Sequence, residues 1–189
     1  MITRYQIQPR GNMQVTTDDQ ANWIRVSAPL PQELQTLATT YGLPATYLAA
    51  ATDQHENARV EGLNPADQVP GLIVLRYPVE TTSETGFDQY NTVPMTMILL
   101  NDRVITITHD PLQAFDDLAQ QKLSPKPEEF ALEVLWLVLH QFVIAMDKLN
   151  NETKQIERSL GKAAKNTQLY QLMACLLYTS DAADEGLGV

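Results

Sequence analysis

Covalent cross-links and export signals are missing from this sequence. Its 189 residues include one cysteine, Cys175, which cannot close a disulfide within the chain, and no Cys-x-x-Cys pair is present for a zinc or redox site. The N-terminus has no basic segment followed by an apolar run, so it shows no secretory signal. We therefore expect an intracellular chain that begins on the cytosolic side.

Basic residues are also scarce, because 13 Lys and Arg stand against 23 Asp and Glu, a formal net charge of -10. Phosphate contacts need clustered Lys and Arg, so this balance argues against a nucleic-acid binder. Glycine-rich phosphate loops are absent, and the 3 histidines show no His-x-His or His-Glu-x-x-His spacing. An acidic surface suits divalent cations, although most acidic proteins are simply soluble.

Hydrophobic runs stay shorter than the roughly 20 residues that cross a bilayer. The most apolar window, residues 130–146, carries Glu133, His140 and Gln141. We therefore expect no transmembrane segment in this polypeptide.

Residues 1–124 alternate short apolar runs with short helical patterns, which predicts a mixed α/β (α+β) domain, a mixed sheet flanked by short helices. We expect strands at 2–8 (an edge strand), 23–26, 71–77 (the middle of the sheet), 94–100 and 103–109. The last two form a hairpin through Asn101-Asp102. We expect helices at 32–41, ending at Gly42, at 45–51 and at 112–121, and a loop at 80–91.

Residues 125–174 predict the start of one long coiled-coil helix. Pro127 suits a first helical turn, Glu128 and Glu129 match the helix dipole, and no proline follows. Spacings of four and three then alternate over about five heptads, which predicts one helix of about 45 residues, roughly 70 Å long. The seam comprises Leu135, Leu139, Phe142, Met146, Leu149, Thr153, Ile156, Leu160, Ala163, Thr167 and Tyr170. Leu149, Ile156 and Leu160 are the candidate contacts between copies of the chain.

The last segment, residues 175–189, begins Cys-Leu-Leu-Tyr-Thr-Ser-Asp-Ala-Ala-Asp-Glu. This string resembles the in-frame translation of a commonly used sequencing adapter. We interpret the segment as an artefact of cloning or assembly, with a natural disordered acidic tail as the alternative.

A series of short segments follows in order between residues 20 and 174: Trp23-Ile24-Arg25-Val26, Tyr41-Gly42-Leu43-Pro44, 55–61, 72–76, 92–99, 104–107, Met146-Asp147-Lys148-Leu149-Asn150 and Ile156-Glu157. Taken together in this order, they resemble the CorA family of magnesium transporters. No single segment is specific, and the resemblance rests on their order and spacing.

This resemblance implies a cytosolic domain followed by long helices that form the funnel of a homopentameric channel. Two membrane helices with a Gly-Met-Asn signature would follow, and that signature is absent here. The chain would then be a non-enzymatic fragment of a magnesium or divalent-cation transporter at the cytoplasmic face of the membrane. Magnesium would be the transported or regulatory ion, with none tightly bound, and self-association would involve no nucleic acid.

One departure from the family concerns its regulatory magnesium. Where the family can carry an acidic ligand, this sequence reads Leu48-Ala49-Ala50-Ala51. Asp53 and Glu56 lie nearby and could supply the oxygen ligands that magnesium prefers.

Two other functions remain open at this point. A soluble coiled-coil scaffold would self-associate through residues 1–174 without membrane segments. A metal-dependent hydrolase would use Asp53, His55 and Glu56 and would lose its activity on Asp53→Ala.

Overall fold

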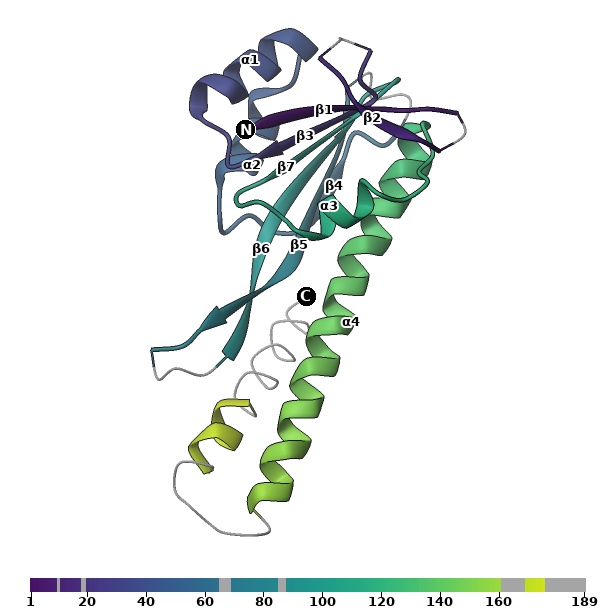
Figure 1. Ribbon diagram of the computed structural model, residues 1–189. Helices are drawn as coiled ribbons and strands as arrows, with labels where there is room; N and C mark the ends of the chain where they lie inside the picture. The colour runs from purple at the N-terminus through teal and green to yellow at the C-terminus, as the bar shows by residue number, and fades with distance from the viewer. Residues whose placement is uncertain (10, 18–19, 65–68, 85–87, 161–168, 176–189) are drawn as a thin grey trace. The chain divides into compact units, whose positions relative to one another are not determined.

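The computed structural model describes residues 1–9, 11–17, 20–64, 69–84, 88–160 and 169–175. Within them, seven strands form one mixed sheet in the order β2-β1-β3-β7-β6-β5-β4 (Figure 1). The elements are β1 (Ile2–Ile7), β2 (Met13–Val15), β3 (Trp23–Ser27), α1 (Pro31–Tyr41), α2 (Ala45–Thr52), β4 (Arg59–Glu61), β5 (Gly71–Thr82), β6 (Asp88–Leu99), β7 (Val104–Thr108), α3 (Ala114–Leu118) and α4 (Pro127–Leu160). The predicted α+β class, with short helices and one long C-terminal helix, is confirmed.

The chain divides into two compact units. Unit 1 comprises Met1–Tyr77 and Thr92–His140, and unit 2 comprises Pro78–Asn91 and Gln141–Val189. The strands β5 and β6 and the helix α4 each run from one unit into the other, so each unit is described by itself.

The order of the strands corrects two expectations. The strand β1 was expected at an edge, but it pairs antiparallel with both β2 and β3, and β2 is the edge strand. The strand β5 was expected in the middle, but it lies next to the edge strand β4, and β7 occupies the middle. The hairpin of β6 and β7 is confirmed, while β7 pairs parallel with β3, which makes the sheet mixed.

The helices α1 and α2 follow directly from local sequence signals. Pro31 opens α1, and the Glu33 side chain accepts a hydrogen bond from the Leu30 amide at 2.8 Å. Gly42 ends this helix with a φ of 63°, a left-handed conformation that glycine adopts without a steric penalty. The predicted helix at 45–51 is α2, whereas the helix predicted at 112–121 is only the short α3.

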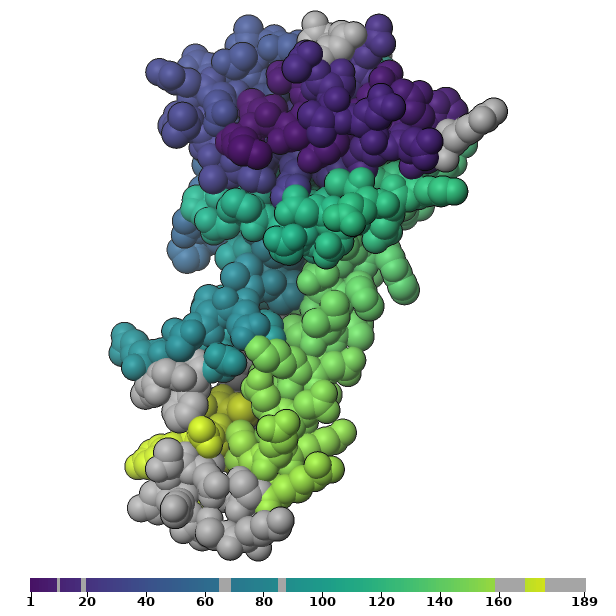
Figure 2. Space-filling model, viewed as in Figure 1, coloured from purple at the N-terminus to yellow at the C-terminus, as the bar shows by residue number. Residues whose placement is uncertain are grey.

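Side chains from both faces of the sheet are buried in unit 1. On one face, β3, β5, β6 and β7 pack under α1 and α2, and Leu34, Leu37, Tyr47 and Ala50 are the buried helix residues there. On the other face, Trp23 stacks on Tyr5 and meets Phe115 of α3 and Phe130 of α4. All five residues of β3 are therefore buried. Figure 1 shows α1 and α2 on one side of the sheet and α3 on the other, and Figure 2 shows the band of residues around α3 lying against the β1–β2 surface.

The hydrophilic stretch 80–91, predicted as a loop, is mostly strand. The strand β5 continues to Thr82 and β6 begins at Asp88, so the two strands form a long antiparallel ribbon whose end lies in unit 2. Side-chain contacts cross the ribbon there, since the Thr81 hydroxyl donates to the Gln89 carbonyl at 3.3 Å.

The long helix α4 begins at Pro127 and runs for 34 residues to Leu160. Residues 161–168, over which the helix was predicted to continue, lie outside the described residues, and residues 169–175 are helical. Of the segment 175–189, interpreted as an artefact, residues 176–189 also lie outside them.

By length and composition, the stretch Pro127–Arg158 could cross a membrane, contrary to the expectation drawn from the shorter window 130–146. The long core helix of a soluble protein meets the same criteria, and 33% of the most apolar window is buried. Length and composition alone therefore do not identify α4 as a membrane span.

Candidate functional site: the turn after α2 and the surface of α4

Asp53, one of the two predicted metal ligands, ends α2. Its amide donates to the Ala49 carbonyl at 3.0 Å, and its Oδ1 accepts a hydrogen bond from the His55 amide at 2.8 Å. A short side chain that binds the backbone two residues later is a common way to stabilise such a turn. The observed contacts of Asp53 are those of a capping residue.

Glu56, the other predicted ligand, pairs with a cation of the chain itself. Its carboxylate forms an ion pair with Arg59, and its Oε1 accepts from the Asn57 amide at 3.2 Å. Arg59 also donates to Glu61 at 2.6 Å, which is the first cause of the raised pKa of its guanidinium. Arg76 joins the same network by donating to the Glu56 carbonyl at 2.7 Å.

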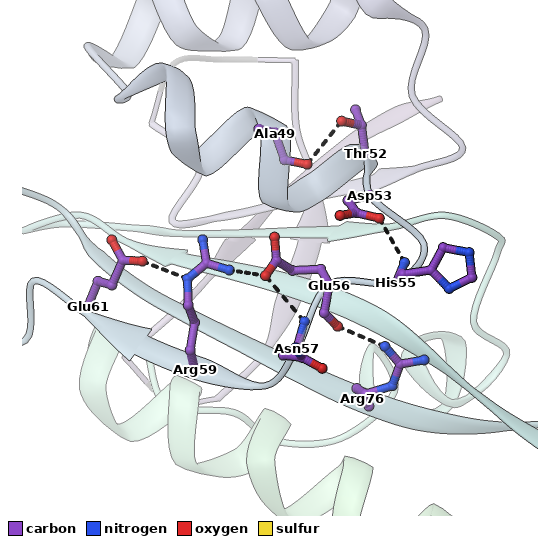
Figure 3. A network of polar contacts seen from close by, with 9 residues as sticks. All are labelled: Ala49, Thr52, Asp53, His55, Glu56, Asn57, Arg59, Glu61 and Arg76. Atoms are coloured by element: carbon purple, nitrogen blue, oxygen red, sulfur yellow. Dashed lines mark hydrogen bonds and ion pairs between the residues drawn. The ribbon is translucent and has the colours of Figure 1, made fainter.

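The turn therefore brings Asp53 and Glu56 into one polar network, in which oxygens of both carboxylates already accept N–H groups (Figure 3). In Figure 3 the His55 ring points away from both carboxylates. Within the described residues, no three His, Cys, Asp or Glu side chains form a group that could hold a metal ion. A metal at Asp53 and Glu56 stays a prediction.

The predicted seam residues of α4 have different environments. Leu149 is buried and packs with Tyr90 of β6 and Ala145, all within unit 2. Ile156 is half-buried, and the side chain of Leu160 lies outside what the structure describes. Leu149 is thus covered by its own chain, and the contacts between copies stay a prediction.

Large apolar side chains are exposed elsewhere on α4. In unit 1 these are Leu132, Trp136 and Leu139, of which Trp136 is 70% exposed. In unit 2 they include Val143 and Met146. These five residues repeat at the same spacings of four and three as a coiled-coil seam, so the sequence contained the signal for this stripe. The predicted seam shared only Leu139 and Met146 with it and missed Trp136.

A hollow of about 380 Å³ lies beside the stripe in unit 1. Its lining is mostly apolar and consists of Leu118, Gln121, Lys122, Leu123, Leu132, Glu133, Trp136, Leu137 and His140. The Oε2 atom of Glu133 is buried here without a hydrogen-bond partner. Burial raises the pKa of the Glu133 carboxyl, and the neighbouring Glu129 adds to the increase, while a hydrogen bond from the Ser124 backbone opposes it.

Replacing Glu133 by glutamine is expected to stabilise the protein at pH 7. A carboxyl whose folded-state pKa is raised contributes full stability below its unfolded pKa and loses it as the pH rises through the folded pKa. Removing the buried charge should raise the melting temperature at pH 7 by roughly 2–4 °C. Near pH 4 the gain should disappear, because the native carboxyl is then protonated.

The matched control is Glu157→Gln, which changes an exposed glutamate of the same helix. Thermal denaturation followed by circular dichroism at both pH values would measure the difference. Two results would contradict an uncompensated charge at Glu133. One is an equal change in melting temperature for the two variants, and the other is the same increase for Glu133→Gln at low and at neutral pH.

Comparison with protein families gives a match over most of the chain. The family model described as CorA-like Mg²⁺ transporter protein matches residues 18–177. A comparison with curated protein sequences gave no match.

Solved structures with the same fold include two of CorA from Methanocaldococcus jannaschii. Its soluble domain has a TM-score of 0.71 at 19% identity, covering 94% of this chain and 72% of that one. The complete structure of the same protein has a TM-score of 0.67 at 18% identity, and the match covers 94% of this chain and 57% of that one. The cytoplasmic domain of ZntB from Vibrio parahaemolyticus has a TM-score of 0.66 at 11% identity, and the match covers 92% of this chain and 69% of that one. This chain thus spans 57% of the length of the complete CorA structure.

Proposed function

The chain belongs to the CorA-like Mg²⁺ transporter family, and from this premise we propose that it is the cytoplasmic domain of a divalent-cation transporter whose pore lies in a further part of the protein. The family match over residues 18–177 carries the proposal. The fold agrees with it, because both the CorA soluble domain and the ZntB cytoplasmic domain superpose on more than nine-tenths of this chain.

The match covers only 57% of the complete CorA structure, which supports a parent protein that is longer than this chain. The exposed residues Leu132, Trp136 and Leu139 of α4 in unit 1 support the same proposal, because neighbouring exposed apolar side chains on a helix usually mark an interaction surface. The family is one of transporters, and a catalytic role has no support from the turn at Asp53, His55 and Glu56, where no metal group forms among the described residues.

The genomic sequence beyond the codon for Ala174 tests this proposal. We expect further helix and then two apolar stretches, each long enough to cross a bilayer, with Gly-Met-Asn after the first. A reading frame that ends without such stretches would favour a soluble self-associating scaffold instead.

Magnesium is proposed as the transported ion and as a weak regulatory ligand near Asp53 and Glu56. Binding there would have to displace the His55 amide and Arg59 from the carboxylates, so we expect low affinity. Calorimetry with MgCl₂ should show heat that is lost in Asp53→Asn/Glu56→Gln and kept in Asp117→Asn. Absence of heat in the native protein would discard this site.

We also propose that the intact parent assembles as a homopentamer, with Ile156 and Leu160 among the contacts between copies. The repeat of four and three along α4 supports association of helices. The number of copies rests on the family resemblance alone, and mass measurement of the detergent-solubilised parent would test it.

A further inference from the structure

Unit 2 contains a cluster of charges that the proposed function does not use. Lys148 on α4 forms an ion pair with Glu80 of β5, and its Nζ lies 3.5 Å from Oδ2 of Asp88 on β6. The same Nζ lies 5.9 Å from the ring centroid of Tyr90. One ammonium group therefore contacts both strands of the β5–β6 ribbon end, which is residues 78–84 and 88–91.

An apolar contact accompanies these charges. Tyr90 is buried with Ala145 and Leu149, which lie within one turn of Lys148 on α4. The Tyr90 hydroxyl donates to the Oε2 of Glu80 at 3.4 Å, so the apolar contact and the ion pair share a residue. The ribbon end thus rests on α4 through one aromatic anchor with a lysine beside it.

The charge of Lys148 balances the charges of Glu80 and Asp88. Without Lys148, the carboxylates of Glu80 and Asp88 would face the helix with no cation from this cluster to balance them. The hydrogen bond to Glu80 raises the pKa of the Lys148 ammonium, so it stays charged throughout the physiological range. Burial raises the pKa of Tyr90, with a further increase from Glu80, so the phenol stays a neutral donor.

The ion pairs are partly exposed, with 39% of the Lys148 side chain and 46% of each acid accessible. A single pair of this kind contributes little. Here two pairs and a cation–π contact share one ammonium, and all three act on the end of the ribbon. Such a contact is strong enough to decide how often the ribbon end opens, and salt should weaken it.

We propose that Lys148 is an internal counter-ion that locks the end of the β5–β6 ribbon onto α4, so that this contact forms without any divalent cation and opens when the charge is screened or removed. The lock goes beyond the proposed transport function and does not depend on it. It gives one part of a cation-transporter family domain a conformation that is insensitive to Mg²⁺.

Hydrogen–deuterium exchange of this chain tests the lock. In Lys148→Met, amides of residues 78–84 and 88–91 should exchange about three- to tenfold faster than in the native protein. Lys148→Arg keeps the charge and should restore most of the protection. The matched control is Lys154→Met, which removes an exposed lysine of the same helix and should leave the ribbon unchanged.

Three further arms make the test specific. Glu80→Gln should accelerate the same amides, and the double variant with Lys148→Met should add little, because both changes break one contact. Added NaCl should accelerate exchange in the native protein but not in Lys148→Met. MgCl₂ at matched ionic strength should act no differently from NaCl. A ribbon protected specifically by Mg²⁺, or one equally protected in Lys148→Met and Lys154→Met, would overturn the proposal.

Discussion

Replacing Trp23 by alanine is expected to lower the free energy of unfolding by about 3–5 kcal/mol. The Trp23 side chain is fully buried, stacks on Tyr5 with centroids 4.7 Å apart, and lies 5.7 and 5.1 Å from the rings of Phe115 and Phe130. Its Nε1 donates to the Thr106 hydroxyl at 3.0 Å. Alanine would leave a cavity where β3, α3 and the start of α4 meet, together with an unpaired hydroxyl.

Urea denaturation followed by circular dichroism would measure this loss. The chain offers a matched control in Trp136→Ala, since Trp136 is 70% exposed and should change stability by less than about 0.5 kcal/mol. Should Trp23→Ala leave too little folded protein, Trp23→Phe, which mainly removes the hydrogen bond and part of the ring, should cost about 1–2 kcal/mol. Equal stability of the two alanine variants would contradict the placement of this core.

Arg25→Met is expected to cost about 2–3 kcal/mol, mainly because a buried backbone carbonyl loses its charged hydrogen-bond donor. Arg25 is 8% exposed, pairs with Asp116 and donates to the Leu112 carbonyl at 3.1 Å. The variant keeps the apolar stem but leaves the carbonyl without this donor. Because the Asp116 side chain is 49% exposed, its carboxylate can regain water, which limits the loss.

The partner variant separates the two contacts of Arg25. Asp116→Asn removes only the half-exposed charge and should cost less than about 1 kcal/mol, because the bond to Leu112 stays. Denaturation of both variants, with amide exchange of α3, would measure the effect. If Asp116→Asn were as damaging as Arg25→Met, the ion pair, and not the buried carbonyl contact, would be the main stabilising feature.

The elements with strong local signals were predictable from sequence. Trp23-Ile24-Arg25-Val26 became β3, the Asn101-Asp102 turn joins β6 and β7, and Pro31 and Gly42 bound α1. The position of β5 was not predictable, because helices cover both faces of the sheet. A strand beside the edge is then as apolar as one in the middle.

The ribbon at 80–91 and the surroundings of α4 depend on tertiary contacts. Tyr90 is buried against Ala145 and Leu149, which lie more than fifty positions away in the chain. The local sequence around Tyr90 is hydrophilic, so it predicted a loop. The candidate site also depends on the folded structure. The sequence could suggest Glu56 as a metal ligand, but only the folded turn shows that Glu56 pairs with Arg59. The spacing of apolar residues predicted a seam on α4. It could not show which of the apolar residues of α4 are buried within unit 2.

The most direct test of the proposed function is cation flux through the intact parent protein. The parent, reconstituted in liposomes that contain a magnesium-sensitive dye, should admit Mg²⁺ in response to its gradient, and liposomes without protein should not. A parent that inserts into the bilayer with this domain folded, yet passes no divalent cation over a range of internal Mg²⁺ concentrations, would contradict the account.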